Sequence, residues 1–192
     1  VAKVAFTGSD ATGQKIYEMA ARGMKQVSLE LGGKSPNIVF EDADLEAAVM
    51  GAISGIFAAT GQTCIAGSRL LLQRSIHDRF MERLIEVARS ARIGDPMSPE
   101  THVGPVTTPP QYRKVLDYIE IAKQEGARCV FGGKPYTGEG AWVEGRTGGQ
   151  FVEPTIFTEV RNDMRIAQEE IFGPVLAVIP FDDEADAIRI AN

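Results

Sequence analysis

The sequence predicts an α/β protein with a mostly parallel sheet that is covered by helices. Short apolar runs alternate along the chain with segments whose apolar residues recur at three- and four-residue steps, as they do in strands and amphipathic helices. Strands that alternate with helices favour a parallel sheet with helices on its faces. A chain of 192 residues can bury about 70% of its unfolded surface, enough for one large domain or for one domain and part of another.

The first elements follow the order strand, helix, strand. Residues 4–6 are a short apolar run that ends in TGS, a helical stretch covers residues 10–22, and residues 26–31 alternate with strand period. A second, apolar helix precedes the GQTC segment, and either Asp42 or Asp44 can cap its start.

The remaining elements continue this alternation. One helix opens at Ser75, with Asp78 in a position typical of a capping box, and another follows Thr108, where a proline suits the first helical turn. The glycine-rich run from Gly132 to Gly149 predicts no regular element other than a hairpin arm. Strands are predicted at residues 70–73, 128–131, 151–157 and 175–181, and a last helix at residues 182–192.

Composition limits the classes of function. The net charge of -6 offers no basic surface for nucleic acid. Two cysteines, without a signal peptide or dense cysteine spacing, favour a cytoplasmic protein. Gly51 and Gly55 form a G-x-x-x-G pattern in an uncharged segment, but its apolar part is shorter than the roughly 20 residues that a bilayer requires. A buried helix is therefore expected there, and no membrane span.

The segment GQTCIAGSR places Cys64 among small and polar residues beyond the end of an apolar helix. A free cysteine is most often an inert buried residue, but these neighbours leave room for a substrate, so both readings stay open. Cys129 lies in the apolar run RCVF and is expected in the core. His77 and His102 have no second histidine at metal-ligand spacing, and no metal site is expected.

Three further motifs could carry chemistry. Glu30 ends a strand just before a glycine turn; it could pair with Lys34 or act as a general base. The glycines of FTGS and the following helix could receive a phosphate or could serve the turn alone. In QEEIFGPV, adjacent side chains diverge, so at most one of Glu169 and Glu170 is expected to face a site.

Taken together, FTGS, LELGGKSP, GQTCIAGSR and QEEIFGPV resemble the NAD(P)-dependent aldehyde dehydrogenase family. Phe57 lies seven residues before Cys64, and Glu30 and Cys64, separated by 34 residues, occur in the family's order. The similarity extends over essentially the whole chain. It implies a Rossmann-like three-layer αβα fold that is truncated at both ends, with residues 1–33 as the C-terminal part of the dinucleotide-binding domain and residues 34–192 as an incomplete catalytic domain.

The resemblance also implies the chemistry. Cys64 matches the nucleophile that attacks the aldehyde carbonyl, and its backbone N–H would supply part of the oxyanion hole. Glu30 matches the base that activates water to hydrolyse the thioester. Among the implied cofactor contacts, Glu170 matches the acid that binds the nicotinamide ribose and Phe172 the ring beside the nicotinamide. The other implied cofactor-binding residues are Gly8, Ser9 and Leu31.

The implied enzyme oxidises a small aldehyde to a carboxylic acid with NAD, or with NADP, in a homodimer or homotetramer without membrane or nucleic-acid partners. Because the family's oxyanion-hole asparagine and most adenosine contacts precede the matching segment, we expect little activity from these 192 residues alone. Two alternatives remain: an acylating enzyme that passes the thioester to coenzyme A, and a non-catalytic structural or binding member. The aldehyde itself is not determined by the sequence.

Overall fold

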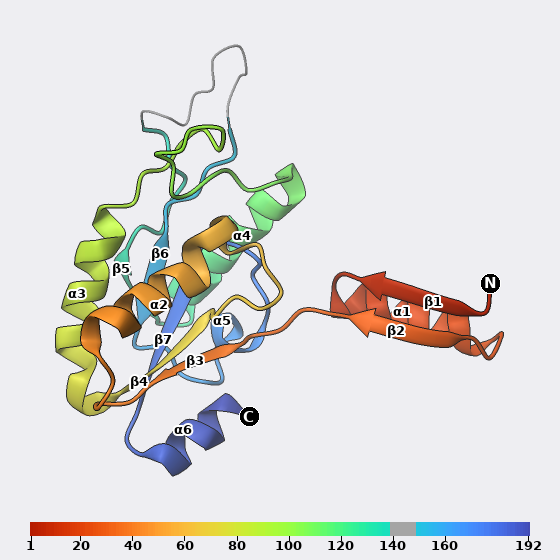
Figure 1. Cartoon of the computed structure of the whole chain (residues 1–192), viewed down its shortest axis with the longest axis horizontal. Helices are drawn as coiled ribbons and strands as arrows, with labels where there is room; N and C mark the ends of the chain where they lie inside the picture. The colour runs from red at the N-terminus through yellow and green to blue at the C-terminus, as the bar shows by residue number, and fades with distance from the viewer. Residues whose placement is uncertain (139–148) are drawn as a thin grey trace. The chain divides into compact units, whose positions relative to one another are not determined.

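A computed structural model describes residues 1–138 and 149–192 (Figure 1). The chain divides into two compact units, Val1–Gly33 and Lys34–Asn192, each with its own sheet. Most of the glycine-rich run discussed above lies outside the described residues. Of its described part, Pro135 forms an antiparallel bridge with Val152.

The first unit has the predicted order of strand, helix and strand. Strand β1 (Lys3–Thr7) and strand β2 (Gln26–Glu30) are parallel, with Thr7 opposite Glu30 at their carboxyl ends. Helix α1 (Asp10–Ala21) connects them and buries few of its residues within the unit.

The second unit contains a five-stranded sheet in the order β3-β4-β7-β6-β5. All neighbouring strands are parallel except β5 and β6, so the predicted mostly parallel sheet is confirmed. The bounds of the strands are β3 Pro36–Val39, β4 Arg69–Gln73, β5 Arg128–Phe131, β6 Thr155–Thr158 and β7 Val175–Phe181.

Helices cover both faces of this sheet (Figure 1). Leu70 and Leu72 of β4 face the apolar cluster formed with α2 (Leu45–Phe57) and α3 (His77–Arg89). Leu71, which points the opposite way, joins the cluster formed with α4 (Pro109–Gln124) and α6 (Glu184–Ala191). The continuous apolar runs of β4 and β7 are explained by this burial on both sides.

Two strands differ from the sequence-based expectation. Strand β3 was not predicted, because PNIV is short and begins with a proline. Strand β6 begins at Thr155 instead of at residue 151, since Pro154 has no N–H to donate to a neighbouring strand. The short helix α5 (Arg165–Gln168) was also not predicted.

The start of α3 corrects the proposed capping box. Ser75 lies in the 3-10 helix η2 (Arg74–Ile76), and its hydroxyl donates to Glu41 Oε2 at 2.6 Å, so it does not cap α3. By contrast, α2 and α4 are capped as their sequences indicate: Asp44 accepts from Ala47 N at 2.8 Å, and Thr108 Oγ1 accepts from Gln111 N at 3.4 Å.

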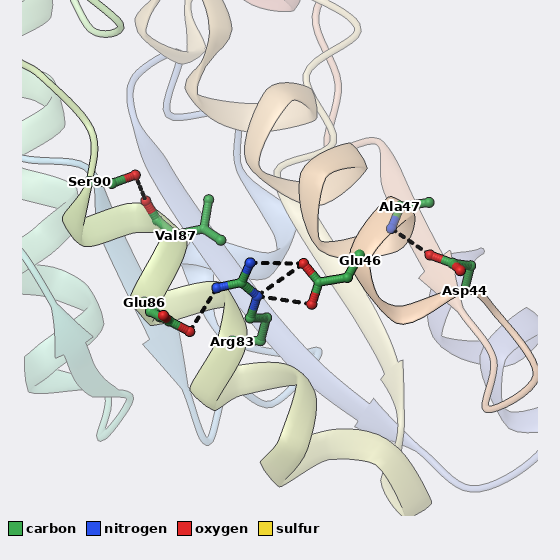
Figure 2. Close-up of polar contacts among 7 residues, drawn as sticks. All are labelled: Asp44, Glu46, Ala47, Arg83, Glu86, Val87 and Ser90. Carbon is green, nitrogen blue, oxygen red and sulfur yellow. Dashed lines mark hydrogen bonds and ion pairs between the residues drawn. The ribbon is translucent and has the colours of Figure 1, made fainter.

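Helices α2 and α3 are also joined at the surface (Figure 2). The Arg83 guanidinium of α3 donates to both carboxylate oxygens of Glu46 on α2 and also to Glu86 Oε2 at 2.7 Å. Because these groups are exposed to solvent, the ion pairs add little stability beside the apolar contacts beneath them. Within the described residues, no helix combines the length and the apolar composition that crossing a bilayer requires.

Candidate active site

The turn that carries Cys64 has an unusual backbone. After α2 ends at Phe57, the 3-10 helix η1 (Ala58–Gly61) contains three successive residues with positive φ: Ala59 at 48°, Thr60 at 59° and Gly61 at 67°. An alanine or threonine in this region costs about 1–2 kcal/mol each. Cys64 lies in the exposed turn that follows, and the chain then returns past α2, where Gly67 N donates to the carbonyl of Gly55 at 2.9 Å.

Hydrogen bonds from a neighbouring loop hold this strained turn. Thr60 Oγ1 donates to the carbonyl of Gly104 at 3.1 Å. Gln62 Oε1 accepts from both the N–H and the hydroxyl of Thr107, each at 3.0 Å, and its Nε2 donates to the carbonyl of Pro105 at 3.3 Å. The amide of Gln62 therefore has partners on both of its polar atoms, only two residues before the thiol.

A cavity of about 410 Å³ lies where this turn meets the loop. Its lining residues are Ala59, Thr60, Gln62, Pro96, Thr101, His102, Gly104, Pro105 and Thr107. Cys64 is not among them, so the cavity adjoins the turn without being lined by the thiol.

The cysteine turn also contacts the QEEIFGPV loop. A Cβ placed on Gly61 would lie 2.1 Å from the carbonyl oxygen of Gly173, so the two backbones touch. Helix α4 holds the same loop, because Gln111 Nε2 donates to the carbonyls of Ile171 at 2.7 Å and Phe172 at 2.9 Å. Phe172 itself has a positive φ of 60°, which is rare for a bulky residue.

The two adjacent acids of this loop have different surroundings. The carboxylate of Glu169 accepts hydrogen bonds from Arg165 and from the hydroxyl of Tyr118. These bonds lower the pKa of Glu169 to about 2, so it is held in a surface network. The negative charge of Glu170 instead acts on Lys34: burial lowers the pKa of Lys34 to about 7, and Glu170 partly opposes this fall. Which of the two acids serves a site stays a prediction.

At the other end of GQTCIAGSR, Arg69 fixes the start of β4. Its Nε donates to the carbonyl of Lys34 at 2.7 Å, and its Nη atoms donate to the carbonyls of Ile190 and Ala191, both at 2.9 Å. The last two carbonyls belong to the C-terminal turn of α6, where a positive charge is favourable. Arg69 is buried, so these bonds anchor the segment after Cys64 against both β3 and α6.

The first unit collects the remaining predicted residues at one end of its two strands. Gly8 N donates to the carbonyl of Glu30 at 3.0 Å, and Leu31 packs against Gly13 of α1. Ser9 precedes α1 but does not cap it through its side chain; its hydroxyl donates to Thr12 Oγ1 at 3.1 Å. The carboxyl ends of parallel strands are where α/β folds build sites.

Cys129 differs from Cys64 in its environment. It is half-buried on β5, packs against the apolar cluster of α4, and has a thiol pKa raised by burial. The expectation of a core residue is correct for its packing but not for full burial, because β5 is the edge strand of the sheet. Within the described residues, no group of three or more His, Cys, Asp or Glu residues is placed to hold a metal ion.

The predicted residues fall into two sets, one in each compact unit. The first unit holds Gly8, Ser9, Glu30 and Leu31, and the second holds Cys64, Glu170 and Phe172. Sequence reasoning missed the residues that support the second set, namely Gly61, Gln62, Arg69, Gln111 and Gly173. Three of these, Gly61, Gln62 and Arg69, lie inside the GQTCIAGSR motif, and Gly173 lies inside QEEIFGPV, but nothing in the sequence identifies their partners.

The α/β fold with a mostly parallel sheet is one that many dehydrogenases share. The chain belongs to the aldehyde dehydrogenase family, whose model matches residues 1–192. It is 51% identical, over its full length, to the betaine aldehyde dehydrogenase of Mesorhizobium japonicum, of which it spans 38%. An indole-3-acetaldehyde dehydrogenase solved in complex with NAD+ is 50% identical and superposes with a TM-score of 0.93 over the whole chain and 38% of that protein. For the betaine aldehyde dehydrogenase of Staphylococcus aureus in complex with NAD+, the identity is 42% and the TM-score 0.95, over the whole chain and 37% of that protein.

Proposed function

We propose that this chain carries the thiol of an enzyme that oxidises an aldehyde to a carboxylic acid with NAD as its cofactor. The observation that carries the proposal is the cysteine turn: Cys64 is exposed, while the backbone on both sides of it is fixed by Gln62 and by Arg69. A reactive thiol needs access and a fixed position together. A merely structural member of the family would need neither.

In this proposal, the Cys64 sulfur attacks the carbonyl carbon of the aldehyde and forms a tetrahedral thiohemiacetal. The backbone N–H of Cys64 donates to the oxygen of this adduct, which supports the negative charge that develops there. The left-handed turn at Ala59–Gly61 lies three residues before Cys64, and its proposed role in this step is to help set the direction of that N–H.

Glu30 is the proposed base that activates water to hydrolyse the thioester left on Cys64. It is the last residue of β2, and its backbone carbonyl is fixed by Gly8 while its side chain is exposed. A carboxylate that is anchored through its backbone but free of burial can reach a water molecule and accept its proton.

The proposed contacts of the dinucleotide come from both units, as two separate sets. Gly8 and Ser9 stand at the start of the twelve-residue helix α1, whose first N–H groups are not capped by the Ser9 side chain and favour a phosphate, although Asp10 opposes it. Leu31 is placed beside this end, and Glu170 and Phe172 would hold the ribose and flank the ring. A bound nicotinamide would supply the acceptor for the hydride that the aldehyde loses.

We propose NAD over NADP because the two solved relatives described above are NAD+ complexes. Their names also indicate two candidate substrates, betaine aldehyde and indole-3-acetaldehyde. Of these two, we propose betaine aldehyde as the substrate, because the relative that is 51% identical is a betaine aldehyde dehydrogenase. A cytoplasmic homo-oligomer, with residues 1–33 in a cofactor domain and residues 34–192 in a catalytic domain, completes the proposal.

The decisive experiment compares three variants of the full-length protein with betaine aldehyde and with indole-3-acetaldehyde. Cys64→Ser should abolish aldehyde-dependent reduction of NAD, whereas the matched control Cys129→Ser should retain most of it. Glu30→Gln should preserve the first turnover, seen as a burst of NADH, but slow the steady state. A steady state equal to that of the wild type in Glu30→Gln would contradict the role of Glu30.

The same assay separates the alternatives. If coenzyme A accelerates the steady state and an acyl-coenzyme A accumulates, the enzyme is of the acylating kind. If the full-length protein reduces no NAD with either aldehyde, whether or not Cys64 is alkylated, the chain belongs to a non-catalytic member of the family.

A further inference from the structure

Lys34 presents an unexplained polar atom in the second unit. Its Nζ is buried and has no hydrogen-bond partner among the described residues. A buried ammonium without a partner is costly, because it has lost its hydration without replacement. Such a group is stable only if it releases its proton or acquires an anionic partner.

Backbone hydrogen bonds hold Lys34 in place, so its side chain cannot reach solvent by a shift of the main chain without breaking them. Arg69 Nε donates to the Lys34 carbonyl at 2.7 Å, and Arg69 N donates to the Ser35 carbonyl at 3.3 Å. Strand β3 then begins at Pro36, which pairs with Arg69 in the sheet. The start of β3 is therefore fastened to β4, directly after the cysteine segment.

The charges that act on Lys34 come from three separate elements. Arg69 on β4 and Lys114 on α4 are positive, and Glu170 in the loop before β7 is negative. The two cations disfavour an ammonium at Lys34, whereas the Glu170 carboxylate favours it. The protonation of Lys34 is thus coupled to where that carboxylate lies.

We propose that Lys34 is a positioning residue for Glu170, and that the Lys34 ammonium and a hydroxyl of the bound cofactor compete for the Glu170 carboxylate. The inference rests on the proposed function, in which Glu170 holds the nicotinamide ribose. When Lys34 is protonated, it draws the carboxylate toward β3; when Lys34 is neutral, the carboxylate is released to the cofactor. Cofactor binding then displaces a proton from Lys34.

Burial, and secondarily the charge of Arg69, lower the pKa of Lys34 to about 7. The ammonium therefore predominates below pH 7 and the neutral amine above it. The dissociation constant of NAD should fall as the pH rises through neutrality. A change of about tenfold between pH 6 and pH 8.5 is expected, which is the size of one charge-assisted hydrogen bond.

The test is calorimetric titration of the full-length protein with NAD, in buffers of different ionisation enthalpy, at pH 6, 7 and 8.5. All proteins carry Cys64→Ser, so that the thiol cannot be the source of a proton. With Lys34 present, NAD binding should release a fraction of a proton near pH 7. Lys34→Met should bind NAD tightly at every pH, and Lys34→Arg weakly at every pH, and neither should release a proton.

The outcomes separate this inference from the proposed function. If Glu170→Gln binds NAD as tightly as the parent protein at pH 8.5, Glu170 does not hold the cofactor and the proposed role of that site is wrong. If Glu170→Gln weakens binding but Lys34→Arg keeps the pH dependence and the proton release of the parent, the inference about Lys34 alone is overturned. Should Lys34→Met fail to fold, Lys34→Arg still decides, because it fixes the positive charge.

Discussion

Gly61 and Gly173 lie in backbone contact, so that a single added methyl group on Gly61 would come within 2.1 Å of the Gly173 carbonyl oxygen. This contact joins the turn that carries Cys64 to the loop that carries Glu170 and Phe172. The proposed nucleophile and the proposed cofactor contacts of the second unit therefore depend on one another's backbone positions, although they are far apart in the sequence.

The first prediction concerns this contact. Gly61→Ala should lower the free energy of unfolding by about 2–4 kcal/mol, because alanine is strained at a positive φ and its methyl group overlaps Gly173. The control is Gly51→Ala on the exposed side of α2, where a Cβ meets nothing within 4 Å. Alanine should raise stability there by roughly 0.5–1 kcal/mol. Urea unfolding of the 192-residue chain measures both; equal effects would contradict the contact.

A second prediction concerns the amide that fixes the cysteine turn. Gln62→Ala removes the partners of Thr107 and Pro105 and should lower kcat of the full-length protein by about 10–100-fold, since a small misplacement of the nucleophile is enough. KM for NAD should change little. Gln124→Ala, at the exposed end of α4, is the matched control and should leave kcat unchanged. Loss of cofactor affinity instead of turnover in Gln62→Ala would argue against a role near the thiol.

A third prediction concerns the two thiols. Iodoacetamide should modify Cys64 at least about tenfold faster than Cys129, because Cys64 is exposed while burial raises the pKa of Cys129. The thiolate is the reactive form, so a raised pKa slows the alkylation of Cys129 in addition to its reduced access. Mass spectrometry of the native chain gives both rates. Equal rates under denaturing conditions would show that the difference comes from the fold, and equal rates in the native chain would refute the assignment.

A fourth prediction concerns the buried guanidinium. Arg69→Lys keeps the positive charge but cannot reach the carbonyls of Lys34, Ile190 and Ala191 together. The free energy of unfolding should fall by about 2–3 kcal/mol, because buried carbonyls are left without donors. Arg74→Lys, at an exposed ion pair with Asp182, should have little effect. Thermal unfolding of both variants measures the two losses of stability; equal losses would contradict the role given to the burial of Arg69.

A fifth prediction concerns acid stability. The hydrogen bonds from Arg165 and Tyr118 depress the pKa of Glu169 from its ordinary value of 4.5 to about 2. A depressed carboxylate pKa stabilises the fold above pH 4.5, and this contribution is lost as the pH falls toward 2. Glu169→Gln should therefore lose part of the pH dependence of stability in that window. The effect should be small and should shrink further in high salt, since the group is partly exposed.

Much of the fold could be predicted because it is local. The periodicity of α4 and the continuous apolar run of β7 depend on residues that are neighbours in the sequence, and both elements lie where they were predicted. Capping was predictable only where the partner is three residues away, as at Asp44. The prediction of a cap at Ser75 was wrong, because the Ser75 hydroxyl donates to Glu41, which is distant in the sequence.

The sequence by itself determined the alternation of strands and helices, the family, and the candidates Cys64, Glu30 and Glu170, since each lies in a short motif that is complete within a few residues. Only the tertiary structure decided what fixes Cys64 and what faces Glu170. The left-handed turn at Gly61, the bonds of Arg69 to α6 and the buried amine of Lys34 all depend on contacts between segments remote in the chain. Such contacts arise from packing, and no local pattern encodes them.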